Sequence, residues 1–155
     1  MSTDHSELKT RVLIVGAGPA GLFLSHLLHI HGIENLVVEQ QSRDYCEKRQ
    51  RAGILEQGTF DVLNLTGVGT RLTDQAIPHE GIDIASGGIL HNINVEDLTN
   101  GRKVYAYAQT EIVKDLFNHH EMNGTHPLTG CEVVRIDEPD RASVMVTVTD
   151  DQDNE

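Results

Sequence analysis

Three glycines near the start of the chain have the spacing of a phosphate-binding turn. Gly16, Gly18 and Gly21 form G-x-G-x-x-G directly after the apolar run of residues 12–15, which predicts a buried parallel strand. The first glycine permits a tight turn, the second lets a pyrophosphate approach the backbone, and the third allows a helix to pack close to the strand. The free N–H groups at the start of that helix favour a bound anion. The pattern therefore indicates dinucleotide binding.

The elements that would position this turn follow it in the chain. Residues 20–31 predict a helix, and its apolar face is expected to carry three leucines, Leu24, Leu27 and Leu28. Glu39 ends the second predicted strand, where a carboxylate accepts hydrogen bonds from ribose hydroxyls. A glycine-rich turn in an ordinary α/β protein is the alternative. Strand, glycines, helix, strand and terminal glutamate together favour the nucleotide site.

The composition argues against several classes of protein. The chain has 155 residues, enough for one domain with a core, and its net charge of −12 argues against binding to nucleic acids or anionic membranes. We find no apolar run of membrane-spanning length and no signal peptide. Cys46 and Cys131 lie far apart in the sequence, which predicts free thiols in a reducing compartment. We therefore expect a cytoplasmic protein.

Further short elements are predicted along the chain, and together they indicate an α/β fold with a Rossmann-like β-α-β half and a small inserted antiparallel β-layer. Because such folds continue their parallel sheet beyond two strands, we expect the chain to be truncated. Helices are predicted over residues 55–65 and 70–76, and over a segment with Thr110 as N-cap that carries Ile112, Val113, Leu116 and Phe117. Strands are predicted over residues 36–38, 81–85, 89–95, 104–108, 131–136 and 142–149, whereas residues 40–51 read as a polar stretch.

The histidines do not form a metal-binding pattern. His26 and His29 lie three apart on the first predicted helix, and His119, His120 and His126 cluster later in the chain. Neither group has the carboxylate or cysteine partners that a metal site requires. We expect them to be surface side chains, with no metal.

Further motifs resemble a known family. Residues 49–58 read R-Q-R-A-G-I-L-E-Q-G, residues 79–81 read H-E-G, and residues 107–111 read Y-A-Q-T-E. With the glycine turn, these runs resemble the flavin-dependent aromatic hydroxylases over nearly the whole chain. The family's proteins are more than twice as long, so the resemblance implies that residues 1–155 are the first part of an FAD-binding domain. The remaining flavin contacts, the substrate-binding residues and the homodimer interface of the full-length parent are then expected after Glu155.

The resemblance implies which residues would contact FAD. The glycine turn would meet the pyrophosphate, Glu39 the adenosine ribose, and Gln109 the flavin and ribityl region. Ala20 stands where the family has a serine, so one hydroxyl contact worth about 0.5–1.5 kcal/mol is lost. For Gln109, a cap at the end of a strand is the alternative role. The implied FAD contacts are Gly16, Gly18, Ala20, Gly21, Glu39, Arg49, Gln50, Arg51, Ala52, Gly53, Ile54 and Gln109.

The resemblance also implies NADPH or NADH as electron donor. Gln41, Tyr45, Arg49 and Arg51 match family positions used for this cofactor, and guanidinium groups suit phosphates because they bind in a bidentate way. Gln40 replaces a usual arginine, which removes a charge that would meet the 2′-phosphate of NADPH. A solvated basic face is the alternative reading of the arginines.

His79 matches a histidine that ends a proton relay in the resembling enzymes. A histidine with a near-neutral pKa can pass the phenolic proton of a substrate to water. An exposed loop histidine is the alternative. The implied reaction uses FAD, NAD(P)H and O2 to hydroxylate 4-hydroxybenzoate next to its phenol, and we expect the chain alone to be inactive. A hydroxylase for another phenol and a non-catalytic nucleotide-binding protein remain as alternative functions.

Overall fold

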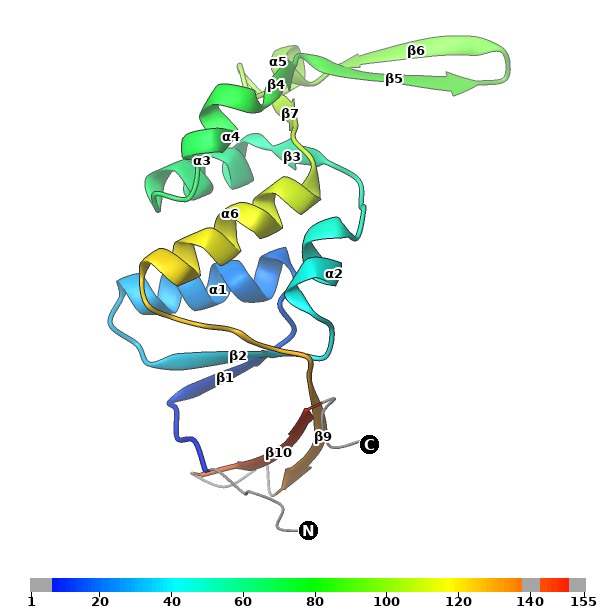
Figure 1. Ribbon diagram of the computed structural model, residues 1–155. Coiled ribbons are helices and arrows are strands. Elements are labelled where there is room, and N and C mark those ends of the chain that lie inside the picture. The colour runs from blue at the N-terminus through cyan, green and yellow to red at the C-terminus, as the bar shows by residue number, and fades with distance from the viewer. Residues whose placement is uncertain (1–6, 138–142, 151–155) are drawn as a thin grey trace. The chain divides into compact units, whose positions relative to one another are not determined.

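The computed structural model describes residues 7–137 and 143–150 (Figure 1). The chain divides into two compact units, each described by itself below. The first unit joins Met1–Cys46 with His120–Glu155, and the second unit is Glu47–His119. None of the helices in the described ranges has the length and apolar character needed to cross a membrane.

A parallel β-α-β arrangement forms the centre of the first unit. Strand β1 (Val12–Val15) leads through helix α1 (Pro19–Ile30) to strand β2 (Asn35–Glu39), which pairs in parallel with β1. Strand β8 (Leu128–Thr129) adds to the other edge of β2, also in parallel, so that the sheet order is β1-β2-β8. The predicted β-α-β half is confirmed, and β8 is an element that the sequence pattern does not reveal.

Helix α1 buries a different face from the predicted one. Its buried residues are Leu22, Ser25 and His26, whereas Leu24 is 46% exposed. Of the expected apolar face, Leu27 and Leu28 are half-buried, whereas the expectation is wrong for Leu24. Ser25 can be buried because its hydroxyl donates to Asn35 Oδ1 at 2.5 Å, at the start of β2. The helix also begins one residue before the predicted start, at Pro19, where a proline lacks only an N–H that would have no helical partner.

An antiparallel pair completes the first unit. Strand β9 (Cys131–Asp137) pairs with β10 (Met145–Asp150), with an irregularity in register between Thr147 and Val148. Both strands lie where the sequence predicts strands, over residues 131–136 and 142–149. Residues 138–142, which connect them, lie outside the described residues.

The second unit contains two small antiparallel sheets. Strands β3 (Ile54–Glu56) and β4 (Ile77–His79) flank β7 (Val104–Ala106). Strands β5 (Gly81–Ser86) and β6 (Ile89–Asn94) form a long two-stranded ribbon, visible in Figure 1. The antiparallel layer expected from the sequence is therefore present. Its β5–β6 turn is formed by two glycines with φ of 59° and 78°, the left-handed values that a two-residue hairpin of this kind requires.

Several helices differ from the predicted boundaries. Helix α2 (Arg43–Lys48) lies in the stretch read as polar and without an element, with Ser42 Oγ accepting the Tyr45 N–H at 3.2 Å. The helix predicted over 55–65 begins only at Gln57, because the preceding residues pair in β3. Thr110 lies inside its helix and is not its N-cap. The other helices are α3 (Gln57–Leu65), α4 (Thr70–Gln75), α5 (Val95–Leu98) and α6 (Gln109–Met122).

Two histidines predicted at the surface are buried in the first unit. His26 is 3% exposed and His120 is 2% exposed. In the ring of His120, Nδ1 is 2.8 Å from Thr125 Oγ1, and Nε2 is 3.1 Å from the carbonyl oxygen of Leu22. A buried imidazole with a partner at each nitrogen costs little, which explains why the prediction is wrong. In the described ranges, no three His, Cys, Asp or Glu side chains gather as a metal ion would need.

Candidate functional site: a glycine turn and the segment that enters β3

The glycines of the turn between β1 and α1 have different structural requirements. Gly16 has φ of +108°, which a residue with a side chain rarely adopts, and its N–H donates to the carbonyl of Val38 at 2.7 Å. A Cβ at Gly21 would lie 2.0 Å from the carbonyl oxygen of Gly16. The fold itself therefore requires glycine at both positions. Gly21 provides the close approach of helix and turn that the sequence pattern predicts.

Gly18 is different because the protein leaves space around it. Its φ of −71° and ψ of 173° are open to any residue, and nothing lies within 4 Å of where a Cβ would be. It is the N-cap of α1, and no side chain caps this helix start. Gly18 and Ala20 are exposed. The first turn of α1 thus presents backbone N–H groups and the positive end of the helix dipole at an accessible surface.

Glu39 lies at the end of β2 and connects this strand to the glycine turn. Its Oε2 accepts the N–H of Ala17 at 2.8 Å, and its Oε1 accepts the N–H of Gln41 at 2.9 Å. The carbonyl of Gln41 in turn accepts the N–H of Gly130 at 3.1 Å. Each carboxylate oxygen can accept a further hydrogen bond, so Glu39 is held beside the turn with acceptor capacity for hydroxyl groups.

The remaining candidate residue of the first unit lies on α2. Tyr45 is 45% exposed there. In the same unit Arg43, the first residue of α2, forms an ion pair with Glu121. The structure therefore places the glycine turn, Glu39, Gln41 and Tyr45 in one unit, as a first set of candidate residues.

A second set lies in the second unit, in the segment that enters β3. Arg49, Gln50, Arg51 and Ala52 are exposed. The following residue, Gly53, is held tightly against the chain after β7. Its carbonyl accepts a hydrogen bond of 2.8 Å from the backbone N–H of Tyr107, and a Cβ on it would lie 2.8 Å from Ala108 Cα.

Gln109 belongs to the same end of the β3–β7 pair. Ile54 pairs with Ala106, the last residue of β7, and Gln109 follows as the first residue of α6. The end of the Arg49–Ile54 segment and Gln109 are therefore brought together. His79 is exposed and pairs with Val104 at the other end of β7, so it stands apart from them.

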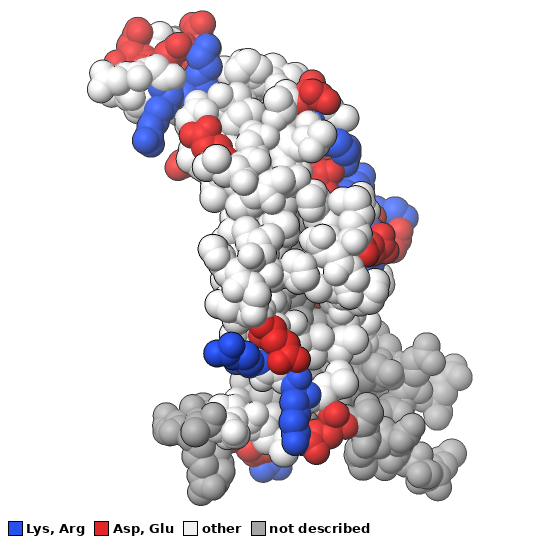
Figure 2. Space-filling model, turned by 90° about the vertical axis from the view of Figure 1, so that its left-hand side faces the viewer, with Lys and Arg blue, Asp and Glu red and all other residues white. Residues whose placement is uncertain are grey.

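Charges are mixed on the surface of both units. Figure 2 shows acidic and basic side chains interspersed among uncharged ones on one face. Opposite charges pair within each unit, as in Lys103 with Glu96 at 3.4 Å and Arg135 with Asp137 at 2.6 Å. Exposed pairs of this kind contribute little to stability.

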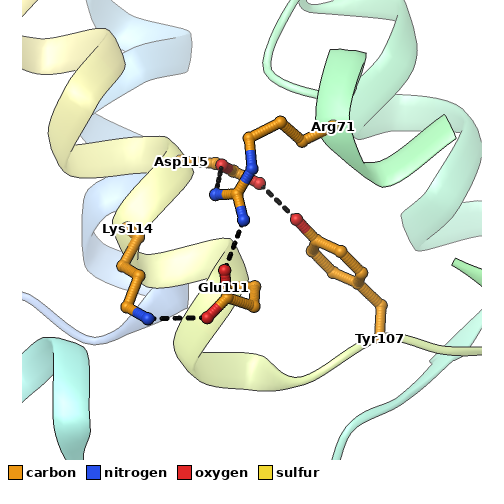
Figure 3. A network of polar contacts seen from close by, with 5 residues as sticks. All are labelled: Arg71, Tyr107, Glu111, Lys114 and Asp115. Atoms are coloured by element: carbon orange, nitrogen blue, oxygen red, sulfur yellow. Dashed lines mark hydrogen bonds and ion pairs between the residues drawn. The ribbon is translucent and has the colours of Figure 1, made fainter. Parts of the chain in front are cut away.

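A partly buried polar network in the second unit is a feature that sequence reasoning missed (Figure 3). The hydroxyl of Tyr107 donates to Asp115 Oδ2 at 2.7 Å, and Arg71 from α4 donates to Asp115 Oδ1 at 2.5 Å. Arg71 also pairs with Glu111, which accepts from Lys114 Nζ at 2.7 Å. The signal in the sequence is the spacing of four between Glu111 and Asp115, which places both carboxylates on one face of α6.

The network shifts the protonation equilibria of its members. Burial and the hydrogen bond to Asp115 raise the pKa of Tyr107 above its ordinary value. The hydrogen bond to Glu111 raises the pKa of Arg71. The hydrogen bonds from Lys114 and Arg71 lower the pKa of Glu111. All three shifts are consequences of the contacts drawn in Figure 3.

Comparison with known proteins defines the class to which this geometry belongs. The family model described as an FAD binding domain matches residues 9–155. The chain therefore belongs to the FAD binding domain family.

Individual relatives are hydroxylases of phenolic compounds. The chain is 46% identical over 117 residues to p-hydroxybenzoate hydroxylase of Acinetobacter baylyi, which covers 76% of this chain and 29% of that protein. It is 34% identical over 77 residues to phenol 2-monooxygenase of a Pseudomonas species, covering 50% of this chain and 12% of that protein. The chain thus spans less than a third of the length of these relatives.

Solved structures share the fold. The crystal structure of p-nitrophenol 4-monooxygenase from Pseudomonas putida matches with a TM-score of 0.77 and 20% identity, covering 91% of this chain and 36% of that chain. This agreement supports the α/β fold class predicted from the sequence.

Proposed function

We propose that this chain is the first part of the FAD-binding domain, residues 1–155, of a hydroxylase that acts on 4-hydroxybenzoate. The observation that carries the proposal is the 46% identity to a p-hydroxybenzoate hydroxylase over three quarters of the chain. The open space at Gly18 and the fixed carboxylate of Glu39 support it from the structure. A homodimer and a cytoplasmic location belong to the same proposal for the full-length protein.

The residues of the glycine turn fit FAD. A pyrophosphate needs close access to backbone N–H groups at a helix start, and Gly18 with the uncapped start of α1 provides it. We assign to Glu39 the role of accepting hydrogen bonds from the ribose hydroxyls, since each of its carboxylate oxygens can accept one more. Gln109 and the Arg49–Ile54 segment would bind toward the flavin. When bound, FAD supplies the redox and oxygen chemistry, and the protein supplies binding, orientation and exclusion of water.

The electron donor in this proposal is NADPH, with NADH as the alternative. Gln41, Tyr45, Arg49 and Arg51 are the residues we assign to it, and the exposure of Tyr45 and of both arginines is compatible with such contacts. The uncharged Gln40 offers no cation to a 2′-phosphate, so a weaker preference for NADPH over NADH is expected.

His79 is assigned the transfer of the substrate's phenolic proton to water. Its exposure in β4 gives the imidazole access to solvent, which this role requires. Deprotonation makes a phenol richer in electrons and more reactive toward an electrophilic oxygen donor.

The test is turnover by the complete gene product that contains this chain. It would be supplied with FAD, O2 enriched in heavy oxygen, and either NADPH or NADH. Candidate substrates are 4-hydroxybenzoate, phenol and 3-(3-hydroxyphenyl)propionate, the last two taken from the names of related enzymes. We expect 3,4-dihydroxybenzoate that carries one heavy oxygen atom. Preferred turnover of another phenol would replace the substrate, and absence of any FAD-dependent product would contradict the proposal.

A further inference from the structure

We propose that Tyr107, Asp115 and Arg71 form a positioning device for the flavin-binding residues Gly53 and Gln109. The inference rests on the proposed function, because it deepens the assignment of these two residues to FAD. It concerns residues that lie in the second unit alone.

Tyr107 connects the two parts of the flavin-binding set. Its backbone N–H holds the carbonyl of Gly53 at 2.8 Å, and its side-chain hydroxyl holds Asp115 at 2.7 Å. Gln109 lies only two residues further along the chain. One residue therefore joins the end of the Arg49–Ile54 segment to helix α6, which Gln109 begins.

Arg71 fixes the helix side of this connection. It reaches from α4 to Asp115 and Glu111, one helical turn apart on α6. Asp115 is 6% exposed and Tyr107 is 5% exposed, so the central hydrogen bond lies away from water. Arg71 of α4 and Tyr107, the residue that follows β7, thus both contact the carboxylate of Asp115 on α6 (Figure 3).

Stability alone gives little reason for this chemistry. An apolar side chain of similar size at position 115 would fill the same space without the cost of desolvating a carboxylate that is 6% exposed. Hydrogen bonds to a buried charge differ from apolar contacts because they define direction as well as distance. The network thus fixes the position of residues 107–109 at the start of α6. Gly53 is fixed with them, because it packs so closely against Ala108 that no Cβ fits between the two residues.

The experiment measures FAD affinity in the complete gene product, after removal and readdition of FAD. Tyr107→Phe removes one hydroxyl oxygen, and Asp115→Asn removes the charge. Thr73→Ala is the matched control, since it deletes a 2.6 Å hydrogen bond to Asn64 from the same helix as Arg71 without touching the network. All titrations are made well below the unfolding midpoint of every variant, where a merely stabilising role would leave the Kd unchanged.

We expect Tyr107→Phe and Asp115→Asn to raise the Kd for FAD about tenfold, the effect of one hydrogen bond to a charged group. Thr73→Ala should leave it close to the wild-type value. In a Gln109→Ala background, Tyr107→Phe should raise the Kd for FAD much less than it does in the wild type, because both changes act on the contact between Gln109 and FAD. If Asp115→Asn does not fold, Tyr107→Phe decides the question alone.

The outcomes separate this inference from the proposed function. A wild-type protein that binds FAD, with a Tyr107→Phe variant that binds it equally well, overturns the inference and leaves the function intact. Fully additive losses in the Gln109→Ala background also overturn it. A wild-type protein that binds no FAD overturns the proposed function, and this inference with it.

Discussion

At the scale of single residues, the glycine turn shows that the same residue type is required for different reasons. Gly16 is required by its positive φ, and Gly21 by the lack of space for a Cβ. Neither the backbone angles of Gly18 nor its surroundings require glycine, so the fold gives no reason for this residue type. A ligand that approaches the backbone is the physical reason we assign.

The requirement at Gly21 is directly testable. A Gly21→Ala substitution would place Cβ 2.0 Å from a backbone oxygen, which cannot move away as a flexible side chain would. We expect a loss of about 1–3 kcal/mol in the free energy of unfolding, measured by urea denaturation. Gly58→Ala in α3 is the control, because nothing lies within 4 Å of its Cβ position, and it should gain up to about 0.5–1 kcal/mol. Equal stability of the Gly21→Ala variant and the wild type would contradict the packing argument.

The positions of residues in a fixed motif are easier to predict from the sequence than the burial of residues that depends on their surroundings in the fold. The glycines and Glu39 occur in a fixed order, and the structure places Glu39 beside the turn. Burial of His26 and His120 could not be predicted, because it depends on partners such as Thr125 and the Leu22 carbonyl that only the fold supplies. For all the candidate site residues, the assignment to FAD or NADPH remains a prediction.

At the scale of elements, length and local signals decided which predictions were confirmed. The first β-α-β arrangement and the β5–β6 ribbon have clear apolar runs and glycine turns, and both are present. Strands β3, β4 and β8 have two or three residues each and exist through their pairing with β7 or β2. Such short strands carry too few residues for an alternating pattern. Helix α2 was missed although Ser42 is a favourable N-cap residue.

The network that joins α4 and α6 should make stability depend on acid pH. The pKa of Glu111 is below its ordinary value of 4.5 in the folded protein, because Lys114 and Arg71 donate hydrogen bonds to its carboxylate. As the pH falls below this ordinary value, the unfolded chain takes up the proton first, so the free energy of unfolding decreases. The contribution is fully present above the ordinary value and is lost as the pH falls through the lowered one.

Urea unfolding of the wild type and of Glu111→Gln, followed from about pH 6 to about pH 3, measures this contribution. We expect the wild type to lose more stability than the variant over this range, since glutamine does not titrate. Identical pH dependences would show that the ion pairs of Glu111 do not contribute.

At the scale of the whole molecule, the chain corresponds to only part of the length of the relatives that it matches. It divides into two compact units, and the candidate FAD contacts are distributed over both. It spans 29% of the length of the p-hydroxybenzoate hydroxylase that it resembles. Substrate choice and dimerisation therefore remain part of our proposal for the complete gene product, and FAD binding is the proposed property that this chain's own residues can test.

The most direct test of the account is FAD titration of the complete gene product and its Gly18→Val variant, with thermal unfolding of both apoproteins. Valine is compatible with φ of −71° and ψ of 173°, and nothing lies within 4 Å of the Cβ position, so the apoproteins should unfold at similar temperatures. The wild type should bind FAD, and the variant should bind it about a hundredfold more weakly, because the side chain occupies the space of the pyrophosphate. A wild type that does not bind FAD, or a variant that binds it equally well, would contradict the assignment of the glycine turn.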